Sequence, residues 1–376
     1  TRQSRRSVHR GGIRSMNDRA TPSARATVSP FRILLLAATF GFWPGPPAGA
    51  AEAVPLFQPP GQWIHDLWFA HADGTYHVFY LQTPTAIGST RDWTNRERLA
   101  QIGYATSRDL VQWTDRGPVV VPFPGTWRDR IATGSVAPHA GKWWMPFSAA
   151  GAAEAVVGLA VSDDLMTWKI VGDGPIVTRR PFAATWQGQP LQWRAVADPY
   201  LYPEPVDGWY WMFLNAQVVG APRNAAGCIG VLRSRDLLAW ESAGIVAYPE
   251  WLERPETPCV WSHGGRWYLY FGAAHDQPEF PARWTAEVPG ELKTKRRVNC
   301  IFMADKFEGP YLPKGTWWYD RLPDGNTGYI HKIVKKPDGT EVLFTSTRSS
   351  LSRPYPVSYG PDGTVLLGQP RAVEMP

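Results

Sequence analysis

Two short sequence patterns recur along the chain, and this internal repetition limits the fold more than any other feature. The first pattern is a glycine followed by a strand rich in aromatic residues. Its five copies begin at Gly74, Gly141, Gly208, Gly265 and Gly339, and the last copy is the most divergent. Five copies of one unit predict five structural repeats.

The second pattern is a glycine-containing strand that runs into Ser-x-Asp-Leu-x-x-Trp. Its copies end at Trp113, Trp168 and Trp240, and a degenerate copy covers residues 302–311. We interpret this motif as structural, because Ser and Asp side chains commonly cap turns while Leu and Trp pack in a core. Its aspartates are therefore expected to belong to the scaffold and not to an active site.

The strands are rich in β-branched and aromatic residues, and glycine, proline and aspartate turns separate them. No long apolar pattern of period 3.6 occurs between residues 51 and 376. Repeats of roughly 60 to 75 residues with about four short strands each are typical of propeller blades. The sequence therefore predicts an all-β fold, a five-bladed β-propeller that forms a single catalytic domain over residues 51–376.

The first 50 residues are typical of an export leader that is removed. Arginines precede an apolar run from Ile33 to Trp43, and the small residues Ala48-Gly49-Ala50 follow it. A membrane anchor is the alternative, but the run is about half of the roughly 20 residues that a spanning helix needs. We expect a secreted or periplasmic protein that is a monomer and has no membrane contact after cleavage.

The formal charge of +6 comes from the leader, because residues 1–50 contain eight arginines and one acidic residue. The remaining chain carries a net charge of −1. A nucleic-acid partner is therefore not expected. Cys228, Cys259 and Cys300 form no metal-ligand spacing, so we expect no metal and favour buried thiols over one disulfide plus a free thiol.

Three acidic residues open apolar strands at similar places in their repeats. Counting back seven to ten residues from each repeat glycine gives Asp66, Gly134-Ser135, Asp198, Glu256 and His331. Inner strands border the axis of a propeller, so we expect these side chains to converge. A buried unpaired carboxylate is costly, and three such acids indicate function.

A pair of carboxylic acids is what glycoside hydrolysis requires, one to protonate the leaving oxygen and one to act as nucleophile or base. A third carboxylate can raise the pKa of the acid or stabilise positive charge on the sugar. The trio Asp66, Asp198 and Glu256 fits this requirement. Whether the reaction retains or inverts the anomeric configuration stays open.

At these residues the sequence resembles the five-bladed furanosidases of glycoside hydrolase families 32, 43 and 68, and the motifs are most similar to family 32. WIHD before GTYHVFYLQTP resembles the family 32 opening motif, which implies that Asp66 is the nucleophile. VADP resembles the Arg-Asp-Pro motif and implies that Asp198 stabilises the transition state. ETPCVW resembles the Glu-Cys-Pro-Asp motif and implies that Glu256 is the acid/base.

The chain also departs from the family 32 motifs. Leu67-Trp68 replace Pro-Asn, Ala197 replaces Arg, and Cys259 replaces Asp. In the family the Arg and Asn contact fructosyl hydroxyls. A β-fructofuranosidase and a family 43-like arabinofuranosidase or xylosidase therefore both remain open.

Other residues near the acids are candidates for substrate binding. Trp63, Trp68 and Trp193 flank the acids and are expected to form sugar subsites with Ser135. In family 43-like members a histidine at the position of His331 helps to hold an axial ion or water, and a core histidine is the alternative. Glu253 competes with Glu256 for the role of acid, but its spacing fits the repeats less well.

Nothing in the sequence indicates an organic cofactor, since no dinucleotide fingerprint or phosphate-cradling glycine loop occurs. We therefore expect a hydrolase of oligo- or polysaccharides that uses water. One alternative is a sugar-binding propeller that has lost catalysis. A glycosidase-like phosphorylase is another, although Arg194 and Arg254 are its only basic candidates.

Overall fold

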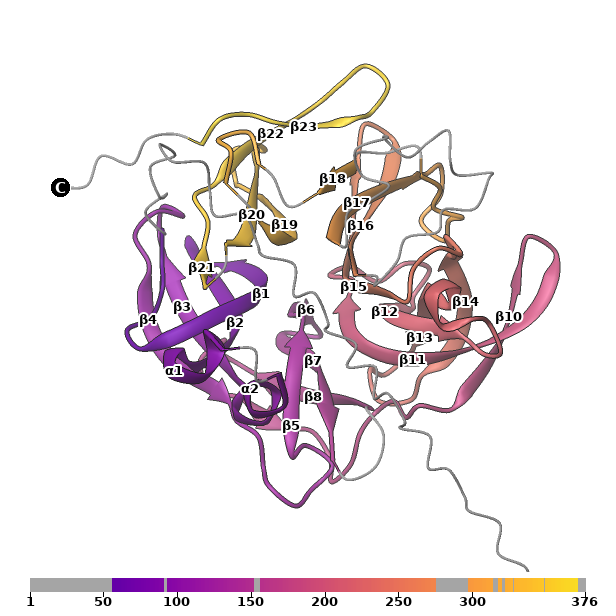
Figure 1. Ribbon diagram of the computed structural model, residues 1–376, viewed down its shortest axis with the longest axis horizontal. Coiled ribbons are helices and arrows are strands. Elements are labelled where there is room, and N and C mark those ends of the chain that lie inside the picture. The colour runs from indigo at the N-terminus through magenta and orange to yellow at the C-terminus, as the bar shows by residue number, and fades with distance from the viewer. Residues whose placement is uncertain are drawn as a thin grey trace, which may run out of the picture. The chain divides into compact units, whose positions relative to one another are not determined.

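The computed structural model describes residues 56–90, 93–151, 156–274, 297–313, 317–319, 322–326, 328–347 and 349–370. Its strands form five antiparallel sheets, and each sheet contains one aromatic-rich repeat (Figure 1). The all-β, five-bladed propeller predicted from the repeats is therefore confirmed. The leader, residues 1–50, lies outside the described residues, so its removal stays a prediction.

The first two blades contain the strands that follow. Blade 1 consists of β1 (Gln62–Ala72), β2 (Thr75–Pro84), β3 (Gln101–Ser107) and β4 (Thr114–Val120), with the short helices α1 (Thr85–Gly88) and α2 (Trp93–Leu99) between β2 and β3. Blade 2 consists of β5 (Arg130–Gly134), β6 (Ala137–His139), β7 (Lys142–Ala150), β8 (Val156–Ser162) and β9 (Lys169–Ile170).

The other three blades have the same antiparallel order. Blade 3 consists of β10 (Pro181–Trp186), β11 (Gln189–Leu201), β12 (Tyr210–Val218), the 3₁₀ turn η1 (Arg223–Ala225), β13 (Gly227–Ser234) and β14 (Glu241–Ala247). Blade 4 consists of β15 (Arg254–His263), β16 (Arg266–Ala274), β17 (Arg297–Ala304) and β18 (Trp317–Tyr319). Blade 5 consists of β19 (Tyr329–Lys335), β20 (Glu341–Thr347), β21 (Ser350–Leu351), β22 (Tyr355–Tyr359) and β23 (Val365–Leu367).

The inner strands of the blades are β1, β5, β11, β15 and β19, and each contacts the inner strands of both neighbouring blades. Hydrogen bonds between the start of the described chain and the last blade close this ring. The Leu56 N–H donates to the Leu351 carbonyl at 3.1 Å, and the Leu351 N–H donates to the Phe57 carbonyl at 2.9 Å. Closure protects sheet edges that would otherwise be free to pair.

The predicted starts of the inner strands are correct to within a few residues for four blades. Asp66, Glu256 and His331 lie in the first half of their strands, and Ser135 directly follows β5. Asp198 lies near the end of β11. The reason is that the first half of β11 pairs with β10 in a hairpin that the repeat pattern does not contain.

The Ser-x-Asp-Leu-x-x-Trp motif forms the turn expected of it. In the first copy the Ser107 hydroxyl accepts the Leu110 N–H at 2.9 Å, while the Asp109 carboxylate accepts the N–H groups of Val111 and Gln112, each at 2.8 Å. The leucines of all three copies are buried. The structural interpretation of this motif is confirmed.

The glycines of the same repeat are required by close packing. A Cβ atom on Gly103 would lie 2.2 Å from the ring of Tyr80, and one on Gly230 would lie 2.3 Å from the indole of Trp193. In each case an aromatic ring, from the adjacent strand β2 or from β11 two strands away, rests directly on the glycine backbone. Core clusters between adjacent blades continue this packing around the ring.

The three cysteines are buried free thiols, as favoured from the sequence. Among the described residues, no helix has the length and apolar character needed to cross a membrane.

Candidate active site

All five inner strands have a shift in pairing register, and in four of them the shift lies beside a residue with positive φ. The pairing register shifts in β1, β11, β15 and β19 beside a residue with positive φ, namely Asp66 (49°), Asp198 (56°), Thr257 (50°) and Ile330 (67°). A β-bulge of this kind turns a side chain away from the ordinary alternation of a strand. The bulges therefore decide which side chains meet on the axis.

Asp66 lies at the bulge of β1 and is partly buried. The Thr133 hydroxyl of the neighbouring blade donates a hydrogen bond to its Oδ2 atom. This bond fixes the orientation of the carboxylate from outside its own strand.

Asp198 lies at the bulge of β11 and is 8% exposed. Its backbone N–H donates to the Ser148 hydroxyl at 2.7 Å. Its Oδ2 atom accepts hydrogen bonds from the Asn215 amide at 3.2 Å and from the Thr257 N–H at 3.1 Å. Residues of blades 2, 3 and 4 therefore hold the backbone and the carboxylate of Asp198.

Burial, and to a lesser degree the negative charge of Asp66, raise the pKa of Asp198 to about 6. The hydrogen bonds from Thr257 and Asn215 and the charge of Lys332 oppose this rise in pKa. The Asp66 and Asp198 carboxylates therefore interact electrostatically.

Glu256 precedes the bulge of β15, and its side chain is 24% exposed. The Tyr329 hydroxyl donates to its Oε2 atom at 2.7 Å, and the Arg254 Nε atom lies 3.9 Å from its Oε1 atom. Burial, followed by the charge of Asp198, raises the pKa of Glu256 to about 7. Asp66 adds a smaller rise and Tyr329 and Arg254 act in the opposite direction, so the pKa of about 7 is the balance of all these effects.

The three acids therefore form one electrostatic cluster, since the charge of Asp66 raises the pKa of both Asp198 and Glu256. Glu253 does not belong to it, since its carboxylate pairs with the Arg223 guanidinium at 2.8 Å. A cluster with one acid of pKa near neutral beside other carboxylates can both donate a proton and stabilise positive charge.

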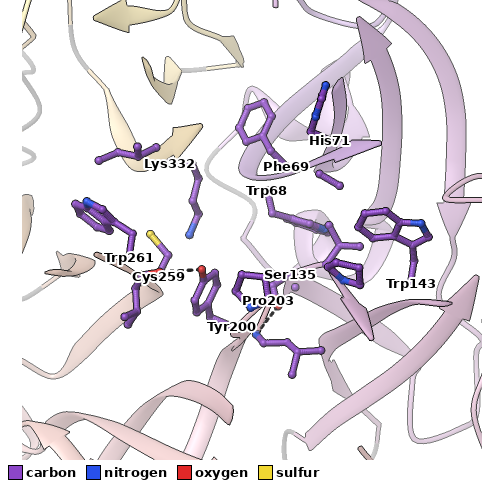
Figure 2. A pocket seen from close by; sticks show the side chains of 17 residues that line it. Trp68, Phe69, His71, Ser135, Trp143, Tyr200, Pro203, Cys259, Trp261 and Lys332 are labelled. Carbon is purple, nitrogen blue, oxygen red and sulfur yellow. Dashed lines mark hydrogen bonds between the residues drawn. The ribbon is translucent and has the colours of Figure 1, made fainter. Parts of the chain in front are cut away.

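An axial cavity of about 290 Å³ is lined by residues that come after the bulges in the inner strands. Trp68, Ser135, Tyr200, Cys259 and Lys332 contribute to its lining, and Figure 2 shows these side chains around the opening. None of the three acids lines this cavity. Trp68 and Ser135, two predicted subsite residues, thus line a cavity to which the acids do not contribute.

The other predicted subsite residues lie in different surroundings. Trp63 is partly exposed, and its indole packs against His65 at 4.6 Å and under the Arg96 guanidinium at 4.7 Å. Trp193 is 0% exposed, stacks on Phe182, and donates from its indole to Ser242 at 3.3 Å. The prediction that Trp193 forms a sugar subsite is wrong, because no face of the indole is accessible.

His331 is buried beside Tyr270, and its Nδ1 atom is 2.8 Å from the Thr345 hydroxyl. Burial, together with the charge of Lys332, lowers the pKa of His331 to about 3. This environment is that of a neutral core histidine. Within the described part of the chain, no group of three or more His, Cys, Asp or Glu residues is placed to hold a metal ion.

Several residues that support the acids were not predicted from the sequence: Thr133, Ser148, Asn215, Arg254, Thr257, Tyr329 and Lys332. A signal did exist for Tyr329. It precedes the bulge of β19 as Glu256 precedes the bulge of β15. Aligning the inner strands on their bulges pairs these two residues, whereas counting from the repeat glycines does not.

Comparison with known families adds a sequence relationship. The family model for the glycosyl hydrolases family 32 N-terminal domain matches residues 57–256, more than half of the chain. The matched range contains Asp66, Asp198 and Glu256. No curated protein is significantly similar to the chain in sequence.

Solved structures with the same fold include an inulosucrase from Halalkalicoccus jeotgali bound to kestose, with a TM-score of 0.63, 19% identity and coverage of 86% of this chain and 92% of that one. A family 32 β-fructofuranosidase from Bombyx mori has a TM-score of 0.62, 13% identity and coverage of 84% and 64%. Sucrose-6-phosphate hydrolase from Lactobacillus gasseri has a TM-score of 0.64, 16% identity and coverage of 85% and 64%. The chain therefore spans about two thirds of the length of the last two proteins.

Proposed function

The chain belongs to glycosyl hydrolase family 32, and on that premise we propose that it hydrolyses a furanoside at the end of a plant or microbial glycan. In this proposal Glu256 is the general acid and base, Asp66 is the nucleophile, and Asp198 stabilises the transition state. The reaction uses water and no organic cofactor.

The observation that carries the proposal is the environment of Glu256. Burial and the neighbouring Asp198 raise its pKa to about 7, so a large fraction of the side chain is protonated at neutral pH. A protonated carboxylic acid can donate to the leaving oxygen as the glycosidic bond breaks. The Tyr329 hydroxyl keeps this carboxyl group oriented.

Asp66 attacks the anomeric carbon in this proposal, and Thr133 orients its carboxylate for the attack. The leaving hydroxyl departs with the proton from Glu256, and a sugar ester forms on Asp66. Water then attacks the ester while Glu256, now a carboxylate, accepts the proton of that water. Both protein groups return to their starting state.

Asp198 acts through its charge. The transition state resembles an oxocarbenium ion, and a nearby negative charge in a poorly hydrated site stabilises it. Since burial and Asp66 raise the pKa of Asp198 to about 6, this charge is lost in acid. Activity should therefore fall on the acid side as Asp198 gains a proton and on the alkaline side as Glu256 loses one.

The substrate class is supported by the family and by the solved structures. The inulosucrase of the same fold is bound to kestose, and two others are named for β-fructofuranosidase and sucrose-6-phosphate hydrolase activity. This favours a fructofuranoside. Ala197 stands where family 32 enzymes carry a fructose-binding Arg. For this reason the substrates to be tested include an arabinofuranoside and a xyloside.

The test is hydrolysis of sucrose, inulin-type oligosaccharides and aryl glycosides of arabinofuranose and xylose. We expect release of a monosaccharide from at least one furanoside, and loss of release in Asp66→Asn. Asp164→Asn is the matched control, because Asp164 belongs to a turn motif in which its carboxylate accepts the Met166 N–H at 2.8 Å. Sugar binding with no hydrolysis would favour a binding propeller, and cleavage that requires phosphate would favour a phosphorylase.

We also propose that the protein is exported and that the leader, residues 1–50, is removed. The support is the apolar run with its small-residue site. The N-terminal sequence of protein recovered from the producing cells' exterior or periplasm tests this, and an intact leader on that protein would contradict it.

A further inference from the structure

Lys332 is a buried cation in the axial cavity, and the mechanism above does not use it. It lies on the inner strand β19, is 8% exposed, and reaches toward Cys259 and Tyr200 in Figure 2. Its Nζ atom donates to the Thr257 carbonyl at 2.9 Å and lies 5.7 Å from the centre of the Tyr270 ring. Burying an ammonium group is costly, so this position needs a compensating role.

The partner of Lys332 connects directly to the acids. Thr257 follows Glu256 in the chain, and its N–H donates to the Asp198 carboxylate at 3.1 Å. The carbonyl of the same residue accepts the bond from Lys332. A single residue therefore links the lysine of blade 5 to an acid of blade 3 and to an acid of blade 4.

Thr257 also has a strained backbone. Its φ of 50° is rare for a β-branched residue, and such a conformation persists only where surrounding contacts maintain it. Lys332 and Asp198 hold the carbonyl and the N–H of this residue from the two blades that flank blade 4. Loss of the lysine removes one of these two contacts.

The charge of Lys332 acts on the same cluster. The titratable and charged side chains around Lys332 and around the three acids come from every inner strand but β5 and from β16: Asp66 and His71 of β1, Asp198 and Tyr200 of β11, Arg254, Glu256 and Cys259 of β15, Tyr270 of β16, and Tyr329 and His331 of β19. Arg254 and Lys332 are the cations of this set. The Arg254 side chain is 49% exposed, so water screens it more than the buried lysine.

We propose that Lys332 is a positioning residue for hydrolysis, which holds the Thr257 peptide against Asp198 and offsets the negative charge of the Asp198 carboxylate. The proposal rests on the hydrolytic function proposed above. Its two parts, the hydrogen bond and the charge, can be separated by substitution.

The experiment compares Lys332→Met, which keeps the length of the side chain but removes charge and donor, with Lys332→Gln, which keeps a donor without the charge. Lys335→Met is the matched control, since Lys335 lies three residues further along the same strand and is exposed. The readouts are the pH profile of kcat/KM, which reports groups of the free enzyme, and the separate values of kcat and KM.

For Lys332→Met we expect a loss in kcat of roughly tenfold to hundredfold with little change in KM, because misplaced acids slow the chemical step more than binding. Loss of a nearby cation makes Asp198 harder to ionise, so the acid limb of the profile should move up by about one pH unit. Lys332→Gln should recover part of kcat but keep the shifted limb. Lys335→Met should match the wild type.

A folded Lys332→Met variant with the kcat and pH profile of the wild type would overturn the proposal. If Lys332→Met does not fold, Lys332→Gln decides the question: a raised acid limb supports the proposal, and an unshifted limb refutes it. Carbon-13 NMR titration of the Asp198 carboxyl, assigned with Asp198→Asn, gives a readout that needs no turnover. If the wild type hydrolyses no substrate, the proposed function fails. The role of the lysine is refuted separately if Asp198 has the same titration midpoint in the wild type and in Lys332→Gln.

Discussion

Replacement of Tyr329 by phenylalanine tests how the protein sets the proton affinity of Glu256. The Tyr329 hydroxyl donates to the Glu256 Oε2 atom at 2.7 Å. This bond favours the carboxylate form and so lowers the pKa of Glu256 against burial and the charge of Asp198. Tyr329→Phe removes the donor and keeps the ring.

The size of the effect follows from the strength of that hydrogen bond. A hydrogen bond to a charged group contributes about 1.5 to 3 kcal/mol. Since the Glu256 side chain is 24% exposed, water replaces part of the lost bond, and the lower end of this range applies. About 1.4 kcal/mol corresponds to about one pKa unit. The pKa of Glu256 should therefore rise by about one unit.

The assay is kcat/KM measured from about pH 4 to about pH 9 on a substrate that the wild type hydrolyses. Glu256 must be protonated to act as the acid, so a higher pKa moves the alkaline limb up by about one pH unit. Tyr311→Phe is the control, because the Tyr311 hydroxyl is buried and donates to the Phe307 carbonyl. An alkaline limb of Tyr329→Phe that is unmoved or lower, in folded protein, would refute the reasoning.

Three further outcomes are expected. Asp198→Asn should move the alkaline limb of the kcat/KM profile to lower pH, the opposite direction to Tyr329→Phe, because loss of a negative neighbour lowers the pKa of Glu256. A shift of this limb to higher pH would contradict the prediction. Glu256→Gln should unfold at a higher temperature than the wild type at pH 8 but not at pH 4. The raised pKa of Glu256 lowers the stability of the wild type by about 1 to 3 kcal/mol when the pH is above that pKa, and by nothing when the pH is below the usual carboxyl range. Equal melting temperatures at pH 8 would count against the pKa shift. Gly230→Ala should lower the free energy of unfolding by about 1 to 3 kcal/mol in thermal or denaturant unfolding, because its Cβ would lie 2.3 Å from Trp193. An unchanged unfolding midpoint would show that the Trp193 side chain moves aside at little cost.

The number of blades and the positions of the acids could be predicted because both depend on short-range patterns. The repeat glycines mark strand ends, and one acid per repeat at a similar distance from the glycine must lie near the axis once the sheets form a ring. The prediction did not require the register of any strand. Glu256 over Glu253 followed from the same spacing and agrees with the Glu253–Arg223 ion pair.

The orientation of side chains beside the acids could not be predicted in the same way. A bulge of one residue exchanges the two faces of a strand for every position beyond it. Trp68 lies two residues after the bulge of β1 and lines the axial cavity, whereas Trp193 lies before the bulges of β11 and packs in the core. The bulges themselves carry no common residue type, since Asp, Thr and Ile occupy them.

Contacts between blades could not be predicted from the sequence either. Thr133, Tyr329 and Lys332 act on acids of other strands, and their separation in sequence from those acids is large. Such pairings depend on closure of the ring and not on local pattern.

The most direct test of the assigned trio is the activity of Glu256→Gln on two substrates that share one sugar but differ in leaving group. On a sugar leaving group we expect a loss in kcat/KM of roughly a hundredfold to ten-thousandfold, the usual contribution of a general acid. On a p-nitrophenolate leaving group the loss should be less than about tenfold, because this group departs with little protonation. Asp66→Asn should lose activity on both substrates. Equal losses on both substrates in Glu256→Gln, with Asp66→Asn still active, would contradict the assignment of the acid and the nucleophile.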